Sequence, residues 1–496
     1  MNNPSPQDPE NASKQQFEER RALAEQRKKL KLEKKLRKKQ MGANQRDESK
    51  WPKCLFWIAK CSRFCSGERA PNSKYCVNHL HVESAPGEKP AESQRKRVVC
   101  PIDPSHTVFE DRLEKHIRVC NKHKSEDAKS ACPYFVPNLN CGNNTSPQSI
   151  AFSTPDEKKA FELALEQKIR SVYKSLFPDG IPTSILRPSR FEPFIADKAT
   201  KGATQESLRH LYQQVSMICN MENCGLMQND PVYVEFGAGR GMLSLGIDYA
   251  LNGKLPNEER PADFQDRGKY LLIDMSPVRF KADRWMRHKE GDFFRVTGNI
   301  RDIDLRRVPI FESERNRQFV GIAKHLCGVA TDYTIRCILN CIQEGKDCQG
   351  LNCVGVCIAT CCHHRCQWHS FVGQEFYRDL GFKEEEWDYL RRLTSWATLT
   401  SKEHSSGEKG GDEKNAGKKE LVNEDTLTYN NVKIDFIPMD VELGRMCKRI
   451  IDYCRSRYIE QQVNALLKDK QFHSRLVYYC DPKDSPENCI ILGSVY

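Results

Sequence analysis

Cysteine and histidine occur in this sequence at spacings that suit a metal ion. The clearest case is Cys100-x5-His106-x9-His116-x3-Cys120, in which His116 and Cys120 are four residues apart and share one face of a helix. Cys100 and His106 flank a proline-containing loop that can fold back onto that face. A tetrahedral structural zinc ion requires four such nitrogen and sulfur ligands. We therefore expect a zinc finger over residues 97–124.

A second group of metal ligands lies upstream and consists of Cys54, Cys61, Cys65, Cys76 and His79. Five candidates compete for four positions, and we prefer the set without Cys61, although the choice between Cys61 and Cys65 stays open. The surrounding segment, 51–82, is poor in apolar residues, so that a metal ion would supply its core. The sequence thus predicts two structural zinc ions, one in each finger.

A glycine loop follows a β-rich stretch in YVEFGAGRGMLSL and leads into a helix. Glycines leave the backbone bare where a ligand approaches closely, and a helix N-terminus adds hydrogen-bond donors. The GxGxG spacing after an acidic strand residue is typical of S-adenosylmethionine binding. Asp274 ends the next strand, where a carboxylate can bind both ribose hydroxyls, and Asp302 follows the third strand, where it could face the adenine. The candidate cofactor-binding residues are Glu235, Gly237, Gly239, Gly241, Asp274 and Asp302.

Two later motifs offer acid–base chemistry. CCHHRC, residues 361–366, follows a near-continuous apolar run expected of a central parallel strand, and AKHLCG ends the strand before it. Ligands in open α/β sheets bind beyond the carboxyl ends of the strands, so both motifs should lie beside the cofactor pocket. A third metal site and a nucleophilic cysteine are alternatives for CCHHRC, but we favour a pocket lip that contacts the substrate. The candidate catalytic residues are Lys324, His325, His363 and His364.

The composition indicates a reducing compartment and an anionic partner. The chain of 496 residues carries 78 Lys and Arg against 67 Asp and Glu, for a net charge of +11. It has no run of about 18 apolar residues, so we expect no membrane-spanning helix. Its N-terminal segment has no apolar core, so we expect no secretion signal. We expect an intracellular protein of the nucleus, the cytoplasm or both. Its 23 cysteines should therefore be metal ligands and buried thiols rather than disulfides.

The elements that position these motifs can be read along the chain. Residues 1–50 form a basic tail with eleven Lys and Arg between positions 20 and 39, which is either a solvated helical or disordered segment or an arm for nucleic acid and a nuclear localisation signal. Its leucines are too irregularly spaced for a convincing coiled-coil seam. Residues 401–425 are polar and low in complexity, which predicts a flexible insertion.

Helices and strands are expected between these segments. Apolar residues recur at helical spacing in 158–177 and 207–221, and VELGRMCKRIIDYCRSRYIEQQ predicts an amphipathic helix near the end of the chain. From Val232 onward, short β-rich runs alternate with helical stretches, which argues for an α/β fold with a parallel sheet. LVYYC and CIILGSVY should close the fold as an antiparallel pair.

The order of these motifs is similar to that of one known family. A CCCH finger, a CHHC finger like that of the U11-48K spliceosomal protein, EFGAGRG, AKHLCG and CCHH together resemble the eukaryotic tRNA ribose 2′-O-methyltransferases that modify position 4 of the acceptor stem. The resemblance covers residues 51–496, with Cys61 as an extra thiol. It implies a Rossmann-like methyltransferase domain over 145–496, S-adenosylmethionine as methyl donor and the tRNA acceptor stem as partner, without a membrane or a protein partner. Methylation of a ribose hydroxyl requires no covalent bond between enzyme and substrate. The resemblance therefore argues against a nucleophilic cysteine in CCHHRC.

The alternative is a non-catalytic zinc-finger RNA-binding protein with a degenerate methyltransferase domain. The intact glycine loop and Asp274 argue against it, because a degenerate domain should lose these residues first.

Overall fold

The computed structural model divides the chain into two compact units, 1–126 and 127–496. The residues that it describes are 53–58, 63–65, 67–76, 79, 97–103, 107–120, 132–142, 147–255, 258, 261, 264–276, 282–288, 290–312, 317–345, 348–398, 433–467 and 470–496. The predicted basic tail, the insertion at 401–425, Cys61 and His106 lie outside these residues.

Within its described residues, the first unit contains only short elements. Strands β1 (Trp57–Ile58) and β2 (Arg63–Phe64) pair antiparallel, and so do β3 (Arg97–Val99) and β4 (Thr107–Phe109). Helix α2 (Leu113–Val119) follows β4 and has no buried residue of its own. Elements of this size bury too little apolar surface to fold unaided, so their stability depends on other links.

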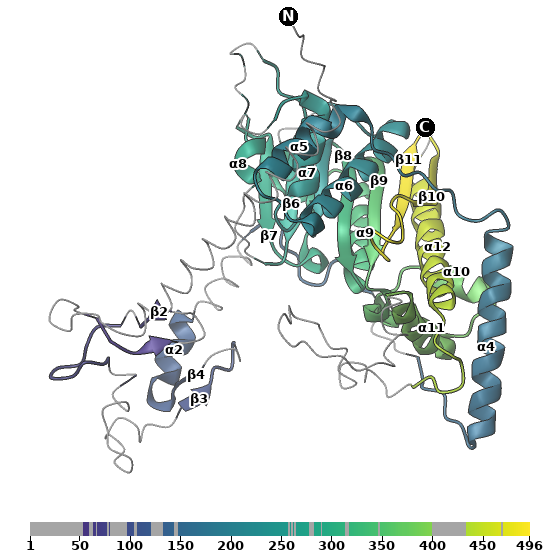
Figure 1. Ribbon diagram of the computed structural model, residues 1–496, viewed down its shortest axis with the longest axis horizontal. Helices are drawn as coiled ribbons and strands as arrows, with labels where there is room; N and C mark the ends of the chain where they lie inside the picture. The colour runs from purple at the N-terminus through teal and green to yellow at the C-terminus, as the bar shows by residue number, and fades with distance from the viewer. Residues whose placement is uncertain are drawn as a thin grey trace, which may run out of the picture. The chain divides into compact units, whose positions relative to one another are not determined.

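The second unit is built on a seven-stranded mixed sheet in the order β10-β11-β9-β8-β5-β6-β7 (Figure 1). Its strands are β5 (Val232–Phe236), β6 (Lys269–Asp274), β7 (Phe293–Thr297), β8 (Gln318–Cys327), β9 (Asn352–Cys361), β10 (Phe472–Tyr478) and β11 (Cys489–Val495). Strands β5 to β9 are parallel, whereas β11 runs antiparallel to both β9 and β10. The expected parallel sheet and terminal antiparallel pair are confirmed. The strand order reverses between β5 and β8, which is where open α/β sheets bind their ligands.

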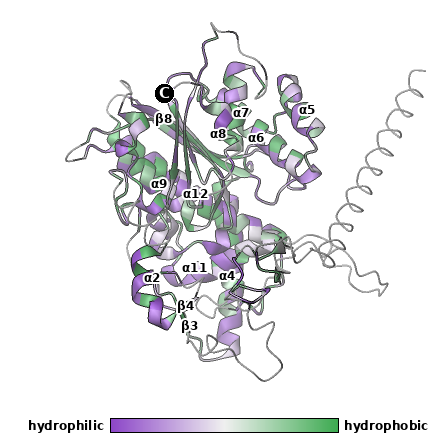
Figure 2. Cartoon of the chain, turned by 90° about the vertical axis from the view of Figure 1, so that its left-hand side faces the viewer, coloured by the Kyte–Doolittle hydropathy of each residue, from purple (hydrophilic) through white to green (hydrophobic). Residues whose placement is uncertain are grey.

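Helices cover both faces of this sheet (Figure 1). Alternate residues of β5 separate the two cores: Val232 and Val234 belong to one and Tyr233 to the other. The first core includes α9 (Val329–Ile342) and α12 (Val441–Leu466), and the second includes the helices α5 (Glu192–Thr200), α6 (Gln205–Asn223) and α7 (Met242–Asn252). Figure 2 shows the apolar strands between these helices. The predicted helices at 207–221 and 158–177 are α6 and α4 (Pro155–Leu176).

A third core joins α4 to the end of the chain. It contains residues of α4, α10 (Gln374–Asp379), α11 (Trp387–Leu393) and α12, with Trp368 and Trp387 at 5.4 Å between ring centroids. Helix α12, expected to be amphipathic, is buried along much of its length because it contacts the sheet and this third core together. Among the described helices, none is long and apolar enough to cross a membrane.

The second unit begins earlier than the expected residue 145. The segment 132–142 packs on the turn η6 (Ile300–Asp302): the Asn140 side chain donates to the carbonyls of Ile300 and Ile303 at 2.7 and 2.9 Å, and the Val136 amide donates to the Asp302 carbonyl at 2.8 Å. This segment therefore belongs with the sheet.

Candidate functional site

The first finger brings its four preferred ligands together. The ligand atoms of Cys54, Cys65, Cys76 and His79 all lie within 4.8 Å of one another. His79 Nδ1 is 3.5 Å from Cys54 Sγ and 3.2 Å from Cys76 Sγ, and the sulfurs of Cys65 and Cys76 are 3.9 Å apart. The Gly67 amide donates to Cys65 Sγ at 3.4 Å, as an amide does to a thiolate that carries charge. This donor set suits a tetrahedral zinc ion.

The second finger shows the same arrangement at three of its four ligands. Cys100 follows β3, His116 lies on α2 and Cys120 caps the end of that helix. His116 Nε2 is 3.3 Å from Cys100 Sγ, and the sulfurs of Cys100 and Cys120 are 4.0 Å apart. The predicted i, i+4 pairing of His116 and Cys120 thus brings both side chains to Cys100. These donors also suit zinc.

The glycine loop connects β5 to α7 through three left-handed residues. Gly237, Gly239 and Gly241 have φ of 66°, 50° and 70°. A Cβ atom would lie 3.0 Å from Leu326 at Gly237 and 2.5 Å from Leu272 at Gly241, but would contact nothing within 4 Å at Gly239. The outer two glycines are therefore required by packing, while the middle one leaves open space over the loop, as a cradle for a ligand needs.

Asp274 holds this loop to the end of β6. Its Oδ2 accepts a hydrogen bond of 2.7 Å from the Gly239 amide, and its Oδ1 accepts one of 2.8 Å from the Ser276 amide. Each carboxylate oxygen keeps a lone pair for the two hydroxyls of a ribose. Met275, the next residue, is 65% exposed, which is unusual for a large apolar side chain and places apolar surface at this strand end. These features fit the nucleoside part of S-adenosylmethionine.

An arginine that the sequence did not single out supports the loop from β7. Arg295 makes a bidentate ion pair with Asp283, at 2.8 and 2.6 Å, and donates to the Gly239 carbonyl at 3.2 Å. The ion pair fixes the guanidinium of Arg295. Gly239 is therefore held at its amide by Asp274 and at its carbonyl by Arg295. An arginine inside a β-rich run was the only sequence signal for it.

Glu235 is buried beneath the loop. Its Oε2 accepts hydrogen bonds from both the amide, at 3.0 Å, and the hydroxyl of Ser244 in the first turn of α7. Burial raises the pKa of Glu235 to about 7, against the opposing effect of those hydrogen bonds. These contacts make Glu235 an anchor of α7. A direct contact between Glu235 and a cofactor stays a prediction.

Asp302 faces away from open space. It is buried, and its Oδ1 accepts from the Asn138 amide at 2.8 Å and from Arg301 Nε at 3.1 Å. The carboxylate therefore fixes the segment 132–142 to η6. The expected contact with an adenine stays a prediction, and the hydrogen bonds from Asn138 and Arg301 give Asp302 a structural role.

Lys324 and His325 leave β8 beside the glycine loop. Phe236 of β5 pairs in register with Ala323 of β8, so Gly237 and Lys324 come next on neighbouring strands. His325 occupies a β-bulge, with φ of 64°, between Lys324 and Leu326. The residue as a whole is exposed, while its imidazole Nε2 lies against Lys324. Bulges often re-aim a side chain next to active sites.

A second histidine, His210 of α6, completes this cluster. Lys324 Nζ lies 2.8 Å from His325 Nε2 and 3.1 Å from His210 Nδ1. Loss of water around the amine lowers the pKa of Lys324 to about 8, and loss of water together with the charge of Lys324 lowers the pKa of His325 to about 4. Near neutral pH the cluster thus holds one cation and a neutral imidazole that can accept a proton.

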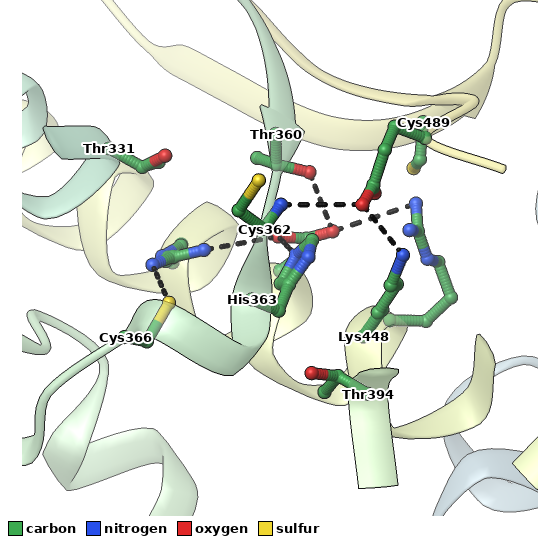
Figure 3. Close-up of polar contacts among 12 residues, drawn as sticks. Thr331, Thr360, Cys362, His363, Cys366, Thr394, Lys448 and Cys489 are labelled. Atoms are coloured by element: carbon green, nitrogen blue, oxygen red, sulfur yellow. Dashed lines mark hydrogen bonds and ion pairs between the residues drawn. The ribbon is translucent and has the colours of Figure 1, made fainter. Parts of the chain in front are cut away.

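The two histidines of CCHHRC have different surroundings. His363 is fully buried, and its Nε2 lies 2.8 Å from Asp452 Oδ1 within a network that includes Arg455 and Thr360 (Figure 3). Its pKa is lowered by burial against the effect of Asp452. His364 is half-buried, and its carbonyl accepts from Arg391. The geometry therefore does not bring His363 to the open edge of the sheet, and its expected role at the pocket lip is not supported.

Comparison with known proteins gives the family. The description "Methyltransferase TRM13" matches residues 212–494, "U11-48K-like CHHC zinc finger" matches 97–121, and "CCCH zinc finger in TRM13 protein" matches 52–80. The chain belongs to the TRM13 methyltransferase family. The expected order of two zinc fingers before an α/β methyltransferase domain is confirmed.

Similar TRM13 proteins occur in distant eukaryotes. The chain is 30% identical to the mouse "tRNA:m(4)X modification enzyme TRM13 homolog", with 88% of this chain and 93% of the relative covered. It is 29% identical to the human homolog, over 88% and 94%, and 28% identical to the Saccharomyces cerevisiae TRM13 enzyme, over 88% and 95%. No solved structure matches the chain.

Proposed function

We propose that this TRM13 methyltransferase transfers a methyl group from S-adenosylmethionine to the ribose 2′-hydroxyl of nucleotide 4 in the acceptor stem of certain tRNAs. The names of the relatives, which are tRNA:m(4)X modification enzymes, support a tRNA substrate and position 4. The observation that carries the proposal is the placement of Lys324 and His325 on the strand next to an open glycine loop.

The glycine loop and Asp274 would hold the cofactor. The open space at Gly239 admits a ligand against the backbone, and the carboxylate of Asp274 offers acceptors for the ribose. When bound, S-adenosylmethionine supplies a methyl group on a positively charged sulfur, which is an electrophile that a weak oxygen nucleophile can attack. Arg295 keeps the Gly239 peptide in place, so the loop needs little reorganisation before binding.

Lys324 and His325 would act on the attacking oxygen. A ribose hydroxyl is a poor nucleophile near neutral pH, so its proton must leave as the oxygen attacks. His325 is exposed and neutral, and Lys324 is a desolvated cation 2.8 Å from it. The ammonium can orient the oxygen and stabilise its developing charge, while the imidazole accepts the proton.

The fingers would carry the two structural zinc ions and help to bind the acceptor stem. A-form RNA exposes its 2′-hydroxyls in a wide, shallow minor groove and is recognised mainly by shape and backbone contacts. Such binding requires no contacts to particular bases. This agrees with a methylated nucleotide that is selected by its position in the acceptor stem.

The test uses the full chain, S-adenosylmethionine with a labelled methyl group, and tRNA transcripts that lack modification. Digestion to nucleosides should show 2′-O-methylation at nucleotide 4. The matched control is the same transcript with a 2′-deoxyribose at nucleotide 4, which removes only the acceptor oxygen and should abolish labelling. Label on a base in the deoxy transcript would contradict the ribose assignment. Binding of tRNA without any transfer would favour a degenerate methyltransferase domain.

A further inference from the structure

Three cysteines of the AKHLCG and CCHHRC motifs meet at the ends of two neighbouring strands. Cys327 ends β8 and Cys361 ends β9, directly opposite each other in the parallel register, and Cys362 follows in the next turn. The sulfurs of Cys327 and Cys361 are 3.4 Å apart, and all three sulfurs lie within 4.8 Å of one another. The zinc fingers do not include these residues.

The spacing of these sulfurs resembles that within the fingers of the same chain. There the sulfur–sulfur distances are 3.9 Å for Cys65 and Cys76 and 4.0 Å for Cys100 and Cys120. Two thiolates on a tetrahedral zinc ion, with bonds of about 2.3 Å, are separated by about 3.8 Å. The sulfurs of Cys327 and Cys361, at 3.4 Å, are about 0.4 Å closer than this, so a small outward shift would let the third group hold a single ion.

The turn that carries Cys362 is fixed by its backbone conformation and by a side-chain contact. Cys362 has φ of 50°, a left-handed value that is unfavourable for a residue with a Cβ. Its amide donates to Glu487 at 3.3 Å, and Glu487 forms a 2.9 Å ion pair with the buried Lys448 (Figure 3). Figure 3 also shows the Cys362 thiol and the His363 ring turned in different directions.

A tight contact joins the two motifs that carry the cysteines. Gly328 follows Cys327, and a Cβ atom there would lie 2.7 Å from Cβ of Arg365 in CCHHRC. The amide of Gly328 donates a hydrogen bond to the Cys361 carbonyl at 3.2 Å. The glycine thus allows the end of β8 to approach the CCHHRC turn, and the approach is what brings Cys327 to the other two thiols.

We propose that Cys327, Cys361 and Cys362 form a third metal site, in which one zinc ion is held by three thiolates. Three protein ligands leave the fourth tetrahedral position for solvent or a further ligand, and Cys327 is exposed to solvent. The ion would fasten the ends of β8 and β9 beside the Lys324–His325 pair. The proposal does not depend on the methyl acceptor.

Metal content of the full chain tests this. Purified under reducing conditions, the wild type should hold three zinc ions per chain, one for each cluster, and Cys327→Ser should hold one fewer. Cys224→Ser is the matched control, because Cys224 is partly exposed and lies outside the three clusters. It should keep the full content. A double variant of the fingers, Cys76→Ser with Cys100→Ser, should retain one ion, which the addition of Cys327→Ser removes.

Two further measurements keep the test decisive. If Cys327→Ser fails to fold, Co²⁺ titration of the finger double variant should still give thiolate-to-cobalt absorption at one equivalent, and its absence would overturn the proposal. Equal zinc content in wild type and folded Cys327→Ser would also overturn it. A Cys327–Cys361 disulfide, found by mass spectrometry in a wild type that holds two ions, would instead make the pair a redox group and would exclude the metal.

Discussion

The Asp274 carboxylate is hydrogen-bonded to the Gly239 amide at 2.7 Å, so the end of β6 and the glycine loop form one rigid unit. Each of the two groups could bind a cofactor alone, but the bond fixes their separation before any ligand arrives. Preorganisation of this kind lowers the entropic cost of binding.

Asp274→Ala should weaken S-adenosylmethionine binding about 10- to 100-fold while the protein stays folded. The change removes the acceptors for the ribose and also frees the Gly239 amide, and hydrogen bonds to a charged group contribute about 1.5–3 kcal/mol. Calorimetric titration with the cofactor measures the loss. Asp230→Ala, at an exposed acid just before β5, is the control and should bind normally. Unchanged affinity in a folded Asp274→Ala would remove the residue from the site.

His363→Ala should destabilise the protein rather than slow methyl transfer selectively. Burial keeps the imidazole neutral, so the change removes a buried hydrogen bond to the charged Asp452, and such a bond contributes about 1.5–3 kcal/mol. Thermal and chemical unfolding should show this loss. His364→Ala, one residue along and half-buried, should unfold like the wild type. A His363→Ala protein with normal stability but a greatly reduced single-turnover rate would restore His363 as a candidate catalytic residue.

Lys324→Ala should lower the single-turnover rate on the order of 10²- to 10⁴-fold, with cofactor and tRNA affinities nearly kept. The reason is that the ammonium contacts His325 and His210 at the strand end beside the glycine loop, not the core. Lys483→Ala removes an exposed lysine and serves as the control for loss of charge. Rates that match the wild type would make the cluster a structural group.

The strands, the glycine loop and Asp274 could be predicted because each depends on local pattern. A polar residue at the end of an apolar run marks a strand end, and parallel strands present those ends at one edge. The same rule placed Lys324 correctly next to the loop, as the pairing of Phe236 with Ala323 shows.

Contacts between distant segments could not be predicted in this way. His210 and Lys324 are 114 residues apart, and they meet only because the fold brings a residue of α6 to a residue of β8. The sequence has no periodicity in this loop that could show which of His363 and His364 points inward. The left-handed conformation of Cys362, just before them, decides it. Asp302 was expected to face the adenine because of its place after β7, but the segment 132–142 supplies its partners.

Glu235 should make stability depend on pH in the opposite sense to an ordinary ion-paired carboxylate. Its pKa in the folded protein is about 7, above the usual value near 4.5, so the folded state keeps a proton that the unfolded state releases. This stabilisation is complete below about pH 4.5 and is lost as pH rises through about 7, an effect of up to roughly 3 kcal/mol. Glu235→Gln cannot titrate and should lose less stability between pH 5.5 and 8.

Urea unfolding at those two pH values measures the difference. Glu192→Gln, at an exposed position in the first turn of α5, is the control and should follow the wild type. Identical pH dependence in Glu235→Gln and the wild type would show that Glu235 is ionised in the folded state, despite its burial.

Cys65→Ser and Cys61→Ser should separate the true ligand of the first finger from the extra thiol. Cys65 Sγ lies 3.9 Å from Cys76 Sγ and accepts from the Gly67 amide, contacts that place it in the ligand cluster. Serine is a much weaker ligand for zinc than a thiolate, so Cys65→Ser should lower the zinc content by one ion per chain and should weaken tRNA binding, because metal supplies the core of this finger. Cys61→Ser should keep both the zinc content and the tRNA affinity.

Metal analysis and tRNA binding at one fixed salt concentration measure the two effects, since salt alone changes nucleic-acid affinity strongly. Loss of zinc from Cys61→Ser with full zinc in Cys65→Ser would exchange the two cysteines in the ligand set.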